Sequence, residues 1–131
     1  MKSIIVTKKD SLAEEINSGS MTRFAGVSEH LSNATNIHMA IADIPVGRCS
    51  TTHYHTNCES AIYVLSGSGI FVHGNNMEIE DEISAGDFIF VPAGALHQPV
   101  NTGDRTLKLI VARNTPTEIV KEKAGLGRKD C

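Results

Sequence analysis

The sequence has little of what binds nucleic acid or spans a membrane. Its 131 residues include 12 basic and 15 acidic side chains, giving a formal net charge of −3. No excess of positive charge is therefore available for a phosphate backbone. Tryptophan is absent, and no segment approaches the ~18 consecutive apolar residues of a membrane-spanning helix. We expect neither nucleic acid nor a membrane as a partner.

Motifs of several enzyme classes are also missing. Gly67-Ser68-Gly69 does not continue into GxGxxG, which argues against a dinucleotide-binding fold. The glycine-containing tail from Gly125 onward lacks the GK[ST] of a phosphate-binding loop. There is no GxSxG nucleophile elbow. The chemistry has to come from other residues.

Cysteine is scarce as well. Cys49, Cys58 and Cys131 form no CxxC pair and are odd in number, which favours reduced thiols over a disulfide framework. The N-terminal stretch offers only the apolar run 4–6 before charge returns, far less than the apolar core of a signal peptide. The sequence therefore predicts a cytoplasmic protein.

Short runs of β-branched and aromatic residues dominate the middle of the chain, and Gly, Pro, Asn and Ser separate them. Such runs at roughly 8–12-residue spacing, without a long helical pattern, are typical of an all-β sandwich or barrel. The predicted strands cover residues 37–44, 52–55, 61–65, 70–73, 77–80, 88–91, 97–101 and 106–113.

The two ends of the chain differ from this pattern. At the N-terminus we expect a strand over residues 3–7, a brief helical turn from Ser11 to Ile16, and loop or irregular strand over residues 17–36. Near the C-terminus, Thr115-Pro116-Thr117-Glu118 has the form of a capping box, which predicts a short helix over 116–124. The length fits one domain over 1–131: an N-terminal strand and loop (1–36), a barrel (about 37–113), and a C-terminal helix and tail (114–131).

Four side chains of metal-binding type lie in this middle region. His53 and His55 alternate on a predicted strand, so their imidazoles leave the same face, and Glu59 and His97 offer two further donors. Imidazole with carboxylate suits Fe, Mn, Zn, Ni or Cu better than calcium. If the strand of His97 lies against that of His53, the four residues would bind one divalent metal and leave one or two coordination positions open.

The histidines alone are a weak signal, but their spacing relative to glycines and a proline is specific. Gly47-x5-His53-x-His55-x3-Glu59 and Gly86-x5-Pro92-x-Gly94-x2-His97-x3-Asn101 together resemble the two signature motifs of the cupin superfamily. The second motif matches at every fixed position. The resemblance implies a double-stranded β-helix, or jelly-roll barrel, with a metal pocket, and it leaves the reaction open.

The first motif departs from its common form. Seven residues separate Glu59 from Gly67, where the common form has six. The extra residue reverses the face from which the Glu59 side chain leaves the strand. Either a bulge near residues 58–61 turns the carboxylate back, or the metal has three histidines only. We expect the bulge, because bulges collect beside active sites.

The resemblance also implies a range of functions. One hypothesis is a metal-dependent dioxygenase, isomerase, lyase or hydrolase acting on a small organic molecule, with Tyr63 as a candidate hydrogen-bond donor or general acid/base. A second is a non-catalytic ligand-binding or sensor module, and a third is a metal that only stabilises the barrel. Cupin barrels often pair through N-terminal strands, so the resemblance also implies a homodimer formed through residues such as Lys2–Thr7.

Overall fold

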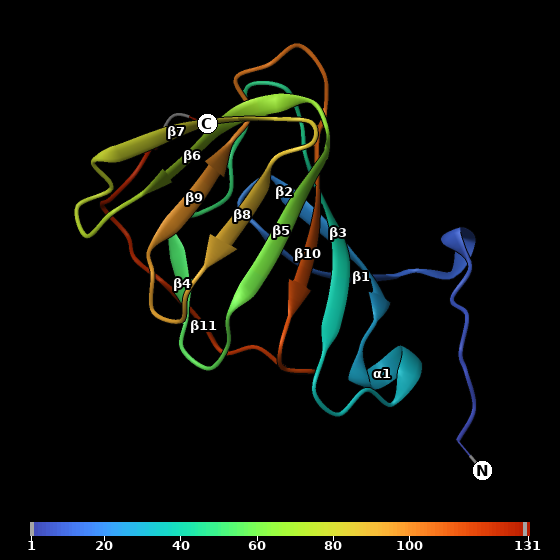
Figure 1. The fold of residues 1–131 in the computed structure, drawn as a ribbon. Coiled ribbons are helices and arrows are strands. Elements are labelled where there is room, and N and C mark those ends of the chain that lie inside the picture. The colour runs from blue at the N-terminus through green and yellow to red at the C-terminus, as the bar shows by residue number, and fades with distance from the viewer. Residues whose placement is uncertain (1, 130) are drawn as a thin grey trace.

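The protein is described by a computed structural model that covers residues 2–129 and 131. The regular structure of this part of the chain is eleven β-strands, one 3₁₀ turn (Lys9–Ser11) and one short helix, α1 (Glu29–Ser32). The strands form two antiparallel sheets that face each other (Figure 1). Across the described residues, no helix is long and apolar enough to cross a membrane.

The first sheet has six strands in the order β1-β2-β3-β10-β5-β8, and the second has five in the order β11-β4-β9-β6-β7. The first comprises β1 (Ala13–Ser18), β2 (Met21–Val27), β3 (His38–Ile44), β10 (Leu107–Arg113), β5 (Ser60–Ser66) and β8 (Phe88–Val91). The second comprises β11 (Val120–Glu122), β4 (His53–His55), β9 (His97–Val100), β6 (Ser68–His73) and β7 (Ile79–Ser84).

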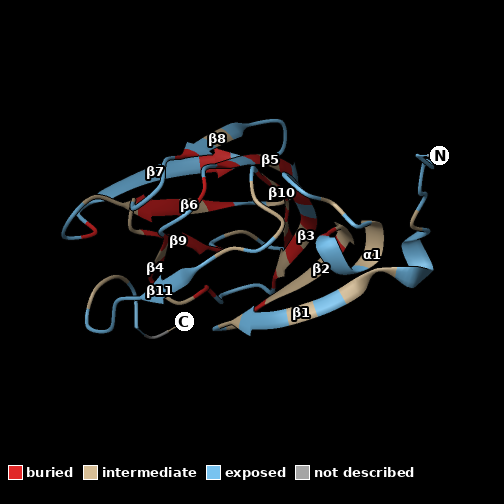
Figure 2. Ribbon diagram, turned by 90° about the horizontal axis from the view of Figure 1, so that it is seen from below, coloured by how far each residue is buried: buried red, intermediate tan, exposed pale blue. Residues whose placement is uncertain are grey.

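The hydrophobic core fills the space between the two sheets, as the buried inner strands in Figure 2 show. Strand β10 alternates strictly, with Leu107, Leu109 and Val111 buried and the residues between them partly exposed. This period of two places every second side chain in the core. The all-β jelly-roll architecture predicted from the sequence is confirmed.

The N-terminal region differs from its prediction. Residues 2–8 form no strand, and β1 (Ala13–Ser18) occupies most of the span expected to be a helical turn. The hairpin partner β2 explains this, because its pairing with β1 supplies backbone hydrogen bonds that an isolated turn lacks. Arg23 on β2 also donates to Glu15 on β1 at 2.9 Å. Tertiary pairing therefore overrides the local preference for a helical turn.

The predicted helix over 116–124 is wrong. The Thr115 hydroxyl donates to the Thr117 carbonyl at 3.0 Å, and the Glu118 carboxylate pairs with Arg23 and Arg113 instead of closing a capping box. The chain continues into β11, which pairs with β4 in the register Val120↔His55. The C-terminal segment is thus a strand beside the histidine-bearing strand.

The expectation of three reduced thiols is also wrong. A disulfide joins Cys49 to Cys131, 82 positions apart in sequence and 5.4 Å apart between their Cα atoms, while Cys58 is free and buried. The tail that carries Cys131 lies against β9, where the Gln98 side chain donates to the Arg128 carbonyl at 2.9 Å and accepts from the Arg128 amide at 2.8 Å. The disulfide and this pair of hydrogen bonds fix the tail to the second sheet.

Candidate metal centre

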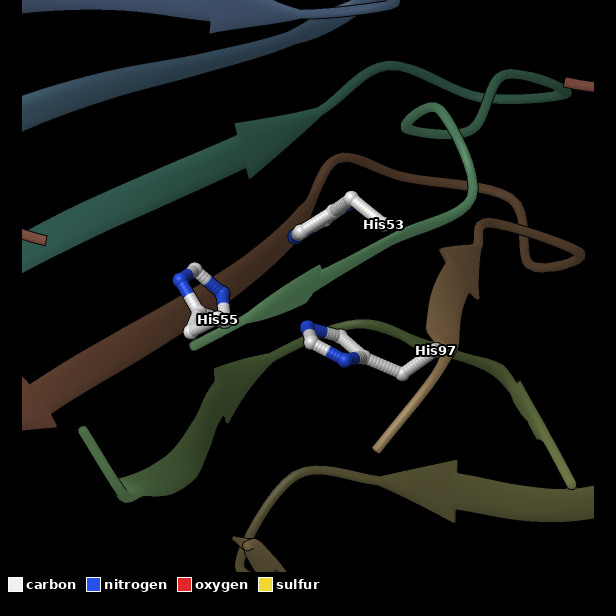
Figure 3. Close-up of side chains that lie close together, drawn as sticks. All are labelled: His53, His55 and His97. Carbon is white, nitrogen blue, oxygen red and sulfur yellow. The ribbon is translucent and has the colours of Figure 1, made fainter. Parts of the chain in front are cut away.

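Three histidines from two neighbouring strands converge inside the barrel (Figure 3). His53 and His55 leave the same face of β4, and His97 is the cross-strand partner of His53 at the start of β9. Each of the three is 5% exposed. One nitrogen atom of each ring lies within 4.8 Å of the corresponding atoms of the other two. The convergence of these two strands, expected from the sequence, is present.

Backbone carbonyls determine which nitrogen of two rings carries the proton. Nδ1 of His53 lies 2.8 Å from the Thr51 carbonyl oxygen, and Nδ1 of His97 lies 2.9 Å from the Ala95 carbonyl oxygen. A carbonyl oxygen only accepts, so each Nδ1 must donate. Nε2 of both rings is therefore left with a free lone pair.

The third ring has a carboxylate as its neighbour. Nδ1 of His55 lies 2.6 Å from Oε2 of Glu118, in a short contact that is too bent for an aligned hydrogen bond. Because a carboxylate is an acceptor, it favours the tautomer with the proton on Nδ1. Nε2 of His55 then faces the cluster with its lone pair, like the other two.

Burial favours the neutral form of two of the rings, His97 and His53. It lowers the pKa of His97 to about 3, with the neighbouring His53 adding to the effect, and it also lowers the pKa of His53. Metal ions bind only the neutral imidazole. Three imidazoles, each with an acceptor close to Nδ1, are a donor set that fits a divalent transition metal.

Three charged side chains, Glu118, Arg23 and Arg113, lie together beside His55. Glu118 pairs with Arg23 and, through Oε2 at 3.1 Å, with Nη1 of Arg113, whose side chain is 2% exposed. Burial by itself would raise the pKa of Glu118, but the contacts with His55, Arg113 and Arg23 outweigh it and hold the pKa well below its usual range. Burial lowers the pKa of Arg113, and the neighbouring Arg23 lowers it further.

The structure does not bring Glu59 to the cluster, which corrects the expected fourth ligand. Glu59 is exposed, and its backbone amide donates to Oδ1 of Asn114. No bulge at the start of β5 turns it back, because β5 pairs with β8 without a break from Ser60↔Val91 onward. The register of β5 shifts only further along, where its partner β10 pairs Lys108 with Ser66 and Leu109 with Val64. Ser60 takes the inward position instead: it is 3% exposed and lines the same small cavity as the histidines.

Tyr63 also points away from the cluster. Ile62 and Val64 on either side of it are buried, so Tyr63 belongs to the outer face of the first sheet. Its ring packs against Phe88, with 4.8 Å between the centroids. The candidate acid/base role of Tyr63 has no geometric support.

Three cavities reach the histidines, and one of them, of about 490 Å³, is bordered by His97 and by residues of β7 and β8. A small one of about 30 Å³ lies inside the barrel between the three rings, with apolar walls that include Met21 and Phe71. It has room for water-sized groups only. A larger pocket of about 910 Å³ lies at the end of the barrel near β1 and the C-terminal segment, and His53 borders both this pocket and the small cavity.

Four residues of this region were not identified from the sequence as part of the site: Ser60, Arg23, Arg113 and Glu118. A signal for Ser60 was present, because six residues separate it from Gly67, the spacing that the common motif gives to its glutamate. The local sequence pattern instead predicts a capping-box role for Glu118. Nothing local marks the two arginines, which become neighbours only through the pairing of β2, β3 and β10.

A jelly-roll barrel with inward-facing histidines on adjacent strands defines a class of β-barrel proteins with a candidate metal pocket. Residues 40–113, more than half of the chain, match the cupin domain family. The chain belongs to this family.

Comparisons with individual proteins agree with the fold. An uncharacterised protein of Methanocaldococcus jannaschii is 27% identical over 111 residues, which are 85% of this chain and 78% of that protein. The polyketide cyclase RemF of Streptomyces resistomycificus is similar in structure, with a TM-score of 0.74 and 21% identity over 99% of this chain and 89% of that one.

A third similarity concerns an oxalate decarboxylase of Bacillus subtilis that has Mn(II) centres. The TM-score is 0.70 at 20% identity, over 82% of this chain and 29% of that one. At such identities the likeness to both solved structures shows the fold alone.

Proposed function

We propose that the protein is a metal-dependent cupin enzyme that acts on a small organic molecule. One divalent transition metal, of the set Fe, Mn, Zn, Ni and Cu, would be held by His53, His55 and His97. The observation that carries the proposal is the shared geometry of the three rings: each has an acceptor at Nδ1, so three Nε2 lone pairs converge in a buried site.

A metal bound there would supply a Lewis acid that polarises a substrate oxygen or activates water. The protein itself would supply the pocket for the substrate and the apolar walls beside the metal. The pocket of about 910 Å³ is large enough for a small organic molecule and reaches His53. Phe71 forms part of the apolar wall and stacks on His97, with 5.6 Å between the two ring centroids. Such walls limit the access of water to the inner face of the cluster. The names of the similar cyclase and decarboxylase, which refer to polyketides and oxalate, support a small organic substrate.

Metal titration tests the site. We expect the metal-stripped protein to bind one equivalent of a first-row divalent metal, and His97→Ala to lose most of that affinity because one of three ligands is gone. His30→Ala is the matched control, since His30 is an exposed histidine on α1 outside the cluster. Binding by His97→Ala as tight as that of the parent protein would show that the site is elsewhere.

Turnover separates the enzyme from the alternative, a ligand-binding or sensor module. The protein loaded with each first-row metal in turn would be assayed against small carboxylates, catechols and sugar phosphates. We expect turnover with at least one metal and one class of substrate. Tight binding of a small molecule without turnover would favour the module.

We also propose that the protein forms a homodimer. The side chains of Ile4 and Val6 in the N-terminal arm are 95% and 71% exposed, and the arm extends away from both sheets (Figure 1). On the outer face of the first sheet, Phe88 and Phe90 are 80% and 65% exposed. Covering the arm and this face with a second copy would remove both apolar surfaces from water.

Light scattering in solution tests the dimer. We expect a mass twice the 14.1 kDa of the chain, and a shift toward monomer for a variant lacking residues 2–7 and for the double variant Phe88→Ser/Phe90→Ser. Val46→Ser, which changes an exposed apolar residue in a turn, is the control. A monomer at high micromolar concentration would contradict the proposal.

A further inference from the structure

The inward position of β5 nearest the histidines carries a hydroxyl where the common motif has a carboxylate. Ser60 is buried and lines the inner cavity, but its side chain is too short to replace a glutamate as a ligand. Among the described residues, no carboxylate joins the three histidines within ligand distance of one metal. The centre therefore lacks an acidic ligand of its own.

A carboxylate does approach the centre from a different part of the chain. Glu118 lies beyond residue 113, where the family match ends, and its side chain is 11% exposed. Pairing of β11 with β4 places it, because Val120, two residues further on, is the cross-strand partner of His55. The C-terminal segment thus brings an acid to the back of the histidine cluster.

Both oxygens of this carboxylate lie close to arginine or histidine nitrogens, although Oε2 has no aligned hydrogen bond. Oε1 contacts Arg23, while Oε2 lies 3.1 Å from Nη1 of Arg113 and 2.6 Å from Nδ1 of His55. Nδ1 and Nε2 lie on different edges of an imidazole ring. A carboxylate bound at Nδ1 therefore lies behind the ring, away from a metal at Nε2, and does not act as a metal ligand in this arrangement.

We infer that Glu118 is the positioning residue of the metal centre, acting through His55. Among the three rings, His55 alone has a charged acceptor at Nδ1; the other two have backbone carbonyls. A carboxylate behind a metal-bound histidine fixes its tautomer and orientation and makes Nε2 a stronger donor. Arg23 and Arg113 hold the carboxylate in place. This inference rests on the proposed metal site.

Zinc affinity is the first test, because zinc is a diamagnetic probe that suits three imidazoles. We expect Glu118→Ala to bind zinc 10–100-fold more weakly than the parent protein, the usual effect of losing such a partner. Glu118→Gln, which keeps an acceptor without its charge, is expected to fall between the two. Glu122→Ala is the matched control, since Glu122 is an exposed carboxylate on the adjoining strand β11.

Nitrogen-15 NMR of the histidine rings separates positioning from a general structural role. In the zinc-loaded parent protein we expect a protonated Nδ1 on each of His53, His55 and His97. In Glu118→Ala, only the Nδ1 signal of His55 should shift or exchange rapidly, because the carbonyl partners of the other two remain. Loosening of the whole C-terminal segment would instead change all three signals.

The outcomes distinguish a failure of the proposed metal site from a failure of the role of Glu118. A parent protein that binds no zinc or other divalent metal would overturn the metal site and this inference with it. Normal binding by the parent and equal binding by Glu118→Ala would overturn the role of Glu118 alone. If Glu118→Ala does not fold, the parent spectrum still decides: a proton on Nε2 of His55, with the metal on Nδ1, would contradict the assignment.

Discussion

The metal-free protein is expected to lose stability steeply as the pH falls below about 6.5. Above this pH, His97 is neutral in both the folded and the unfolded chain, so its contribution is constant. Below it, the unfolded chain takes up a proton at the ordinary histidine pKa, whereas the buried ring does not until its lowered pKa of about 3. Protons therefore favour the unfolded state throughout this window.

The expected loss is large. Each pH unit between the two pKa values costs about 1.4 kcal/mol for one such histidine, so His97 alone accounts for roughly 4–5 kcal/mol by pH 3. His53 acts in the same direction, because burial lowers its pKa too. Below about pH 4.3 the lowered pKa of Glu118 adds a further loss, since the unfolded carboxyl then protonates first. Total stabilities of domains are only about 5–15 kcal/mol.

Urea unfolding of the metal-stripped protein between pH 7.5 and 4.5 measures this effect. We expect the free energy of unfolding to fall across the range, and His97→Gln to show a shallower fall because one titrating ring is gone. His73→Gln is the control, since His73 is part-exposed and pairs with Asp81 near the surface. A flat profile between pH 7.5 and 5 would show that the rings are not buried in neutral form.

The barrel could be predicted because short stretches of the sequence define its single strands and turns. Runs of apolar, β-branched and aromatic residues define β5 and β10, and the spacing of Gly94 to His97 places a histidine just after a turn. Glu59 was placed wrongly for an equally simple reason: side chains alternate along a strand, so one added residue moves a carboxylate from the inner face to the outer one. The spacing from Gly67, counted backward, identifies Ser60 instead.

The C-terminal segment could not be predicted in this way. A capping box is a two-residue signal worth about 1 kcal/mol. Glu118 has stronger partners in Arg23 and Arg113, which come from strands β2 and β10 and meet it only in the folded chain. Charged groups at this depth have to be paired, so the carboxylate follows the arginines and the helix does not form.

The cysteine pairing depends on the same segment. An odd number of cysteines says nothing about which two come together, and Cys49 and Cys131 are 82 positions apart. They meet because β11 lies beside β4 and because Gln98 holds the tail through Arg128. Once the tail takes this course, Cys131 packs with the buried cluster that contains Cys49, Val72 and Val100.

Loss of this disulfide is expected to lower the free energy of unfolding by about 2–5 kcal/mol, because the bond closes a long loop and so restricts the unfolded chain. At roughly 3–5 °C per kcal/mol for a chain of this size, the melting temperature should fall by at least about 6 °C. The same change should appear when the parent protein is reduced and when Cys49→Ala/Cys131→Ser is made.

Reduction of the protein and counting of its free thiols test whether the disulfide is present. A phosphine reductant should lower the melting temperature of the parent protein and of Cys58→Ala, which keeps the bonded pair, but should leave Cys49→Ala/Cys131→Ser unchanged. Alkylation of the denatured, unreduced protein should modify Cys58 alone. Modification of all three cysteines without reductant, with no thermal response to it, would mean that hydrogen bonds such as those of Gln98 hold the C-terminal tail without a covalent link. The position of Glu118 behind His55 would then depend on β11 and the two arginines alone.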